Sequence, residues 1–80
     1  MILVEIYVAC VDKSYDFKLD KMVTIEEIIE EIVAIINQKE DLNISKQNLT
    51  LSIVEKNVIM NKQLTLSDYN ICQGSKLILV

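Results

Sequence analysis

The sequence predicts an α+β fold in which one long helix packs on one face of a mixed five-stranded sheet. Two alternating apolar segments open the chain, a capped helical stretch follows, and short alternating segments lead to an apolar final strand. Residues 1–80 are expected to form a single domain with short connections, because 51% of the residues are hydrophobic and the chain has one Gly and no Pro.

The first segment predicts a β-hairpin. Apolar side chains alternate with other residues from Ile2 to Val8 and, after a turn around residues 11–14, from Tyr15 to Leu19. Shifting the register by one residue would bury Glu5 and three charged residues of the second strand. The alternate, apolar residues therefore form the core face. Its members are Ile2, Val4, Ile6, Tyr15, Phe17 and Leu19.

A capping box at Thr24 and Glu27 predicts the start of the helix. An apolar stripe at helical spacing should then cover the sheet, and it consists of Ile25, Ile28, Ile29, Ile32, Ile35 and Ile36. Four carboxylates occupy the opposite side, which we interpret as a solvated surface. They are Glu26, Glu27, Glu30 and Glu31.

The second half of the chain predicts short strands. A polar connection over residues 39–48 has Leu42 or Ile44 as its apolar anchor, and a third strand follows at residues 49–54. A turn at residues 55–57 leads to a fourth strand around residues 58–60. Thr65 and Asp68 predict a single helical turn, and Gly74 permits a tight entry into the last strand, Lys76–Val80.

Composition excludes several classes of function. The net charge of −4 and pI of 4.6 disfavour nucleic-acid binding, and no apolar run is long enough to cross a bilayer. Without His, the chain cannot build a Ser-His-Asp or Cys-His pair or an ordinary zinc site, so we expect no enzymatic activity, no catalytic residue, no metal and no cofactor. Cys10 and Cys72 are expected to be free thiols, which suits a cytoplasmic protein.

The stretch Thr65–Ile71, T-L-S-D-Y-N-I, followed by an apolar strand, resembles the C-terminal part of ubiquitin. With the order of elements above, the resemblance implies a ubiquitin-like β-grasp fold whose first and last strands pair in parallel at the sheet centre. It also implies that the Tyr69 hydroxyl bonds to main chain near Asn61. Ubiquitin-like proteins that are conjugated end in a flexible Gly-Gly tail, whereas this sequence ends at Val80, so we expect binding without covalent attachment.

Alternation predicts a binding surface on the sheet face away from the helix. That face should hold Leu3, Glu5, Tyr7, Thr50, Ser52, Val54, Ile78 and Val80. We expect Leu3, Tyr7, Val54, Ile78 and Val80 to bind partners, with Leu3, Val54, Ile78 and Val80 in one neighbourhood. Ungapped matching places Val54 and Val80 on two members of ubiquitin's hydrophobic recognition patch. The acidic helix face is the alternative binding surface.

In length and order of elements the chain resembles the YukD/EsaB type, free-standing ubiquitin-like proteins associated with the type VII (WXG100, ESX-like) secretion machinery of Gram-positive bacteria. The resemblance implies a cytoplasmic accessory or regulatory protein that binds subunits of a membrane secretion complex, without inserting into the membrane. A weak homodimer stays open. The alternatives are an adaptor of another bacterial pathway and, less favoured, a sulfur carrier, which needs a C-terminal Gly-Gly thiocarboxylate.

Overall fold

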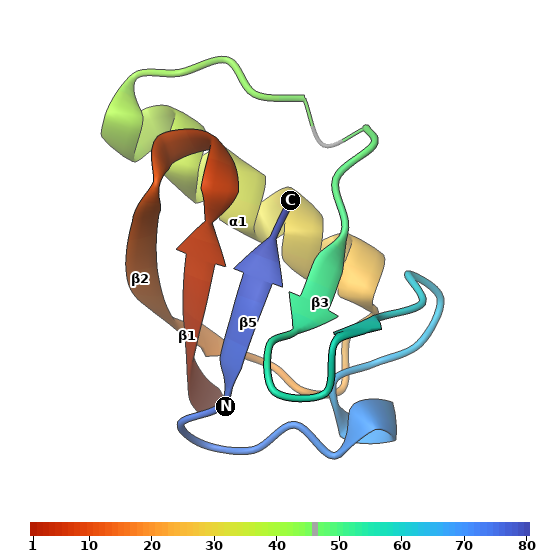
Figure 1. Cartoon of the computed structure of the whole chain (residues 1–80). Helices are drawn as coiled ribbons and strands as arrows, with labels where there is room; N and C mark the ends of the chain where they lie inside the picture. The colour runs from red at the N-terminus through yellow and green to blue at the C-terminus, as the bar shows by residue number, and fades with distance from the viewer. Residues whose placement is uncertain (46) are drawn as a thin grey trace.

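The computed structural model describes residues 1–45 and 47–80 as a five-stranded sheet with one long helix behind it (Figure 1). The strands are β1 (Ile2–Val8), β2 (Lys13–Leu19), β3 (Leu51–Ile53), β4 (Val58–Ile59) and β5 (Lys76–Leu79), and the helix is α1 (Ile25–Glu40). Two short 3-10 turns, η1 (Ala9–Val11) and η2 (Ser67–Tyr69), lie in the connections.

The strand order is β2-β1-β5-β3-β4, and β1 and β5 run parallel while every other neighbouring pair is antiparallel. The first and last strands of the chain therefore meet at the centre of the sheet. This arrangement confirms the predicted ubiquitin-like α+β fold. Gly74 enters β5 with φ +85°, a left-handed conformation that other residues adopt at a cost, and its N–H donates to the Leu3 carbonyl at 2.8 Å.

Helix α1 begins where the capping box predicts. Thr24 is its N-cap, and the Thr24 hydroxyl accepts from the Glu27 N–H at 3.3 Å. The helix continues to Glu40, so the connection that was expected from Lys39 begins later than predicted. Asp41 ends the helix in the left-handed conformation, with φ 53°.

The buried face of α1 differs from the predicted stripe at one position. Ile35 was expected to face the core but is 40% exposed, whereas Val33 is buried. At 3.6 residues per turn these two side chains lie on opposite flanks of the stripe, each roughly 80° from its centre. The flank with Val33 is the buried one. The buried residues are Ile25, Ile28, Ile29, Ile32, Val33 and Ile36.

A polar cluster fastens the end of α1 to β2. The Glu40 carboxylate accepts from Lys13 Nζ at 2.9 Å and from the Tyr15 hydroxyl at 2.8 Å. Lys39 Nζ lies 5.2 Å from the centre of the Tyr15 ring, within the range of a cation–π contact. The helix is thereby tied to the sheet edge at its C-terminal turn.

Ile44, and not Leu42, is the apolar anchor of the connection after α1. The Asn37 side chain brackets Ile44, because Asn37 Nδ2 donates to the Ile44 carbonyl at 3.0 Å and the Ile44 N–H donates to Asn37 Oδ1 at 2.7 Å. Ile44 packs on the core, and Leu42 is exposed.

The turn at η2 follows both sequence motifs. The Asp68 N–H donates to the Thr65 hydroxyl at 3.2 Å, and the Thr65 N–H donates to Asp68 Oδ2 at 2.9 Å, which is a reciprocal capping box. The Asn61 N–H donates to the Tyr69 hydroxyl at 2.7 Å. This is the main-chain bond implied by the resemblance to ubiquitin, and it fixes the loop after β4.

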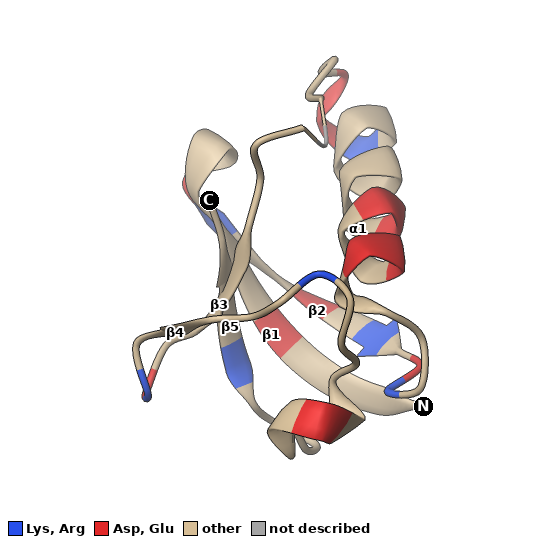
Figure 2. Cartoon of the chain, turned by 90° about the vertical axis from the view of Figure 1, so that its right-hand side faces the viewer, with Lys and Arg blue, Asp and Glu red and all other residues tan. Residues whose placement is uncertain are grey.

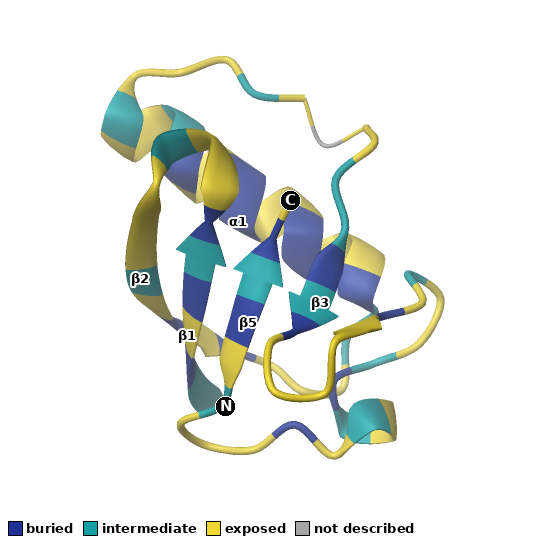
Figure 3. Ribbon diagram, in the orientation of Figure 1, coloured by how far each residue is buried: buried dark blue, intermediate teal, exposed yellow. Residues whose placement is uncertain are grey.

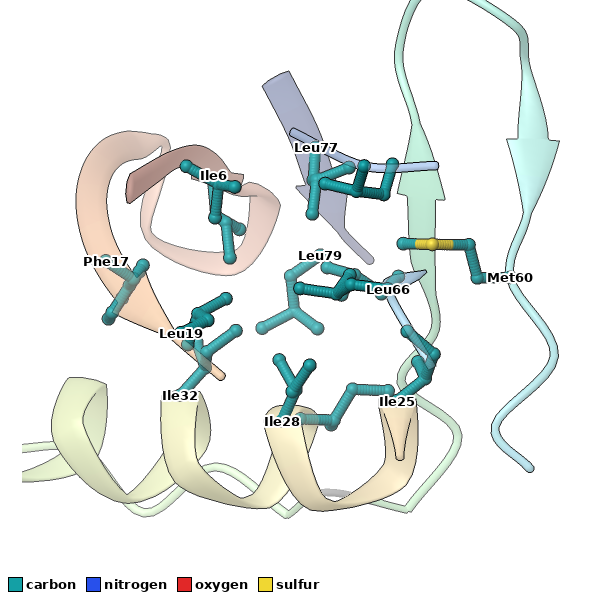
Figure 4. Packing of buried hydrophobic residues seen from close by; sticks show 14 of the residues in the cluster. Ile6, Phe17, Leu19, Ile25, Ile28, Ile32, Met60, Leu66, Leu77 and Leu79 are labelled. Atoms are coloured by element: carbon teal, nitrogen blue, oxygen red, sulfur yellow. The ribbon is translucent and has the colours of Figure 1, made fainter. Parts of the chain in front are cut away.

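A cluster of hydrophobic side chains, most of them aliphatic, fills the space between the sheet and α1 (Figure 4). Leu77 lies in the central strand β5, opposite Ile6 of β1 and Ile53 of β3. Cys10 and Cys72 are both free and exposed. Within residues 1–45 and 47–80, the helix and the shorter turns lack the length and apolar composition of a membrane-spanning helix.

Replacing Leu77 with Ala should cost about 2–5 kcal/mol of unfolding free energy, because the side chain is 1% exposed and its loss leaves a cavity. Denaturant unfolding followed by circular dichroism measures the change. The neighbouring exposed residue supplies a matched control, and Lys76→Ala should change stability by less than about 0.5 kcal/mol. Equal midpoints for the two variants would contradict the register of β5.

The Glu40 cluster predicts a pH-dependent contribution to stability. The hydrogen bonds from Lys13 and then Tyr15 lower the pKa of Glu40 below its ordinary value of 4.5. A depressed carboxyl pKa stabilises the folded state above that value, and the stabilisation is lost as pH falls through the folded-state pKa. Wild type should therefore unfold at higher denaturant than Glu40→Gln at pH 7. The difference should shrink below pH 4.5, and a difference independent of pH would contradict the assignment.

Candidate interaction surface

The face of the sheet away from α1 is the candidate functional surface, and it faces the viewer in Figure 3. Along β1, β3 and β5 the side chains alternate between buried residues under the helix and half-exposed or exposed residues on this face. The outer residues are those that alternation predicts: Leu3, Glu5, Tyr7, Thr50, Ser52, Val54, Ile78 and Val80.

The central row of this face crosses four strands. Tyr7 of β1 lies opposite Ile78 of β5, Ile78 opposite Ser52 of β3, and Ser52 opposite Ile59 of β4. Directly opposed residues of neighbouring strands point to the same side of a sheet. Ile59, which is 68% exposed, therefore extends the apolar surface to the sheet edge.

A second row is polar toward β2 and apolar toward β3. Asp16 lies opposite Glu5, and Glu5 lies opposite Lys76. The Val54 N–H donates to the Lys76 carbonyl at 3.3 Å, which places Val54 beside Lys76, and Val54 is 45% exposed. Opposite charges thus border the apolar surface on the side of β1.

Val80 extends the apolar surface at the other end. It exchanges backbone hydrogen bonds with Thr50 at 2.7 and 3.0 Å and is 50% exposed. We call Tyr7, Val54, Ile59, Ile78 and Val80 the outer apolar patch.

Leu3 lies outside the outer apolar patch. Its carbonyl accepts from Gly74 and its N–H donates to the Gln73 side chain at 2.8 Å, so it lies at the entry to β5. Val80 is six positions beyond Gly74, a distance on the order of 20 Å along a strand. The prediction that Leu3 and Val80 lie in one neighbourhood is therefore wrong. Val54, Ile78 and Val80 remain together in the outer apolar patch.

The sequence analysis missed Ile59. The assignment of faces left out the fourth strand, because β4 has two residues and so shows no alternation of its own. The turn at residues 55–57 could have revealed it. The turn fixes the register of β4, which places Ile59 opposite Ser52 and so on the outer face.

Tyr7 gives the outer apolar patch its one polar atom. Its hydroxyl donates to the Asp12 carboxylate, and this hydrogen bond, together with desolvation and the negative charge of Asp12, raises the pKa of Tyr7 above 10.0. Asp12 adopts the left-handed conformation with φ 52° at the end of η1, which brings the carboxylate back toward β1. The ring is thus uncharged at neutral pH and its hydroxyl is already bonded.

The acidic helix face lies on the other layer of the molecule. Glu26, Glu27, Glu30 and Glu31 are all exposed on α1, and Figure 2 shows the acidic colour concentrated along the first half of the helix. Glu26 and Glu27 lie in the first turn, where the helix dipole favours negative charge.

The described residues give little support for small-molecule chemistry. Within residues 1–45 and 47–80, no three His, Cys, Asp or Glu side chains gather as a metal site. A surface hollow beside η2 has a volume of about 190 Å³. Pockets for drug-sized ligands usually exceed about 300 Å³. The arrangement favours recognition of a surface over enclosure of a ligand.

Comparison with curated proteins finds no match for this chain. The family model described as "WXG100 protein secretion system (Wss), protein YukD" matches residues 3–79 of the 80-residue chain. The match covers the helix and all of the strands except Ile2, the first residue of β1. The chain therefore belongs to the YukD family of WXG100 secretion-system proteins.

Proposed function

We propose that this chain is a non-conjugating, non-enzymatic binding module that attaches to a protein subunit of a type VII secretion complex through the outer apolar patch. The observation that carries the proposal is the set of aliphatic side chains on the sheet face opposite the helix. Three of them, Val54, Ile59 and Val80, are exposed and lie outside the buried hydrophobic cluster on the other face of the sheet. Apolar surface of this kind commonly marks an interaction site.

The side chains of the outer apolar patch indicate what kind of surface the partner presents. Ile78 and Tyr7 form a half-buried centre, and the more exposed Val54, Ile59 and Val80 surround it. Such a surface fits an apolar partner face that leaves the charged row of Glu5 and Lys76 at the solvated rim. Binding through hydrophobic contact needs no bond to the chain terminus, which supports non-covalent association.

A cytoplasmic location and the absence of catalysis are part of the same proposal. Membership of the YukD family supports a role beside a secretion apparatus, and two exposed free cysteines suit a reducing compartment. The lack of His in the sequence removes the commonest general base. An adaptor of another pathway would use the same patch, so identifying the captured subunit distinguishes the two functions.

Substituting Val54 or Ile59 with Asp should abolish capture of the secretion-complex subunit while the fold persists. Each carboxylate meets water in the free protein, and Asp at position 54 would lie beside Lys76. In the complex it would be desolvated against an apolar surface, a cost of several kcal/mol that removes a micromolar contact. Affinity capture from detergent-solubilised host membranes, followed by mass spectrometry, measures the loss.

Ile35→Asp is the matched control, because Ile35 is 40% exposed but lies on α1. This variant should retain the same subunit. If all three variants capture it equally, the sheet face is not the binding surface. The acidic helix face then becomes the candidate, and its binding should weaken with added salt.

A further inference from the structure

Strand β2 is an edge of the sheet with an unpaired side. The strand order ends at β2, which has seven residues and borders the sheet on the left in Figure 1. An edge of this length offers a row of free backbone donors and acceptors to another strand. Charged side chains on an edge strand commonly prevent pairing with other chains. The charges of β2 therefore determine which strand can pair with it.

The hydrogen bonds of β1 show which backbone groups of β2 are free. The Glu5 N–H donates to the Ser75 carbonyl at 3.0 Å, and the Leu3 carbonyl accepts from Gly74, so the odd-numbered residues of β1 bond toward β5. The even-numbered residues of β1 therefore bond toward β2, where Phe17 and its alternate neighbours are their partners. The backbone groups of Ser14, Asp16 and Lys18 point away from the sheet.

Two of these residues, Asp16 and Lys18, carry charges on the outer face, and neither lies opposite a residue of opposite charge in β1. Asp16 lies opposite Glu5, a like charge, and opposed like charges destabilise a pair of strands. Lys18 lies opposite Leu3. Neither Asp16 nor Lys18 forms an ion pair with another residue in the part of the chain that the structure describes.

We propose that β2 pairs antiparallel with β2 of a second copy of this chain, with the two-fold axis at Phe17. In this register Asp16 of each copy lies opposite Lys18 of the other, and both residues have outward backbone groups, so each pair also exchanges two backbone hydrogen bonds. The interface is isologous, because the same segment serves both copies.

Charge selects this register from its neighbours. Sliding the strands by two residues in one direction places Asp16 opposite Asp16 at the axis, and sliding them in the other places Lys18 opposite Lys18. A slide by one residue would pair outward backbone groups with groups already bonded to β1. The proposed register alone among these pairs opposite charges twice and relieves the contact between Asp16 and Glu5.

Pairing at β2 goes beyond the proposed function and does not depend on it. The two sheets become one, and both outer apolar patches lie on the same side, since Asp16 and Lys18 share the outer face with the patch. A dimer would then present two patches side by side, and a partner that carries two sites would bind both more strongly than one.

Charge reversal tests the pairing in the full chain by sedimentation equilibrium at low salt. Asp16→Lys and Lys18→Asp should each weaken self-association at least about tenfold, because both opposed pairs become like charges. An equimolar mixture of the two variants, and the double variant, should restore association to within about threefold. Glu31→Lys, an exposed reversal on α1 with the same change in net charge as Asp16→Lys, should leave association unchanged within about twofold.

Amide hydrogen exchange locates the contact. With rising protein concentration the amides of Ser14, Asp16 and Lys18 should exchange more slowly, while those of Tyr15 and Phe17 should not change. A wild-type chain that stays monomeric at about 1 mM, where even contacts of −4 kcal/mol are populated, overturns the proposal. So does a dimer that both single variants retain, or a mixture that fails to restore association.

Discussion

The parallel pairing of β1 with β5 is the constraint on which the rest of the structure depends. It joins the two ends of the chain at the sheet centre, so the intervening residues must supply a crossover helix and a second pair of strands. Gly74 allows the chain to turn into β5, and Leu77 then lies in the middle of the core opposite Ile6. The hydrophobic cluster between sheet and helix therefore also holds this pairing in register.

The same register creates the candidate site. Once Ile6 and Leu77 are buried, Tyr7 and Ile78 must lie on the opposite face, because successive side chains of a strand alternate. A chain that needed stability alone would fill that face with polar residues. Here it carries the aliphatic side chains of Val54, Ile78 and Val80 among polar ones, and Ile59 adds a further one at the edge. Membership of the YukD family associates the chain with a secretion system, and this surface is our proposal for its contact with a protein of that system.

Much of the fold was predictable from local chemistry. Alternation in the first hairpin, the N-cap at Thr24 and the motif around Tyr69 each describe a contact within a few residues or a known pattern, and all three are present. Failures came from long-range geometry. The exposure of Ile35 depends on which flank of the helix the rest of the fold covers, and the separation of Leu3 from Val80 depends on the register between distant strands. Neither quantity is encoded in a local pattern.

The most direct measurement of the central claim is methyl NMR of protein labelled at Ile and Val, titrated with the secretion complex purified from host membranes. The methyl signals of Ile78, Ile59 and Val54 should broaden or shift, because these side chains would become buried at the contact. Those of Ile35 on α1 should stay unchanged. Perturbation confined to Ile35 and the helix, with unchanged signals from the sheet face, would contradict the account.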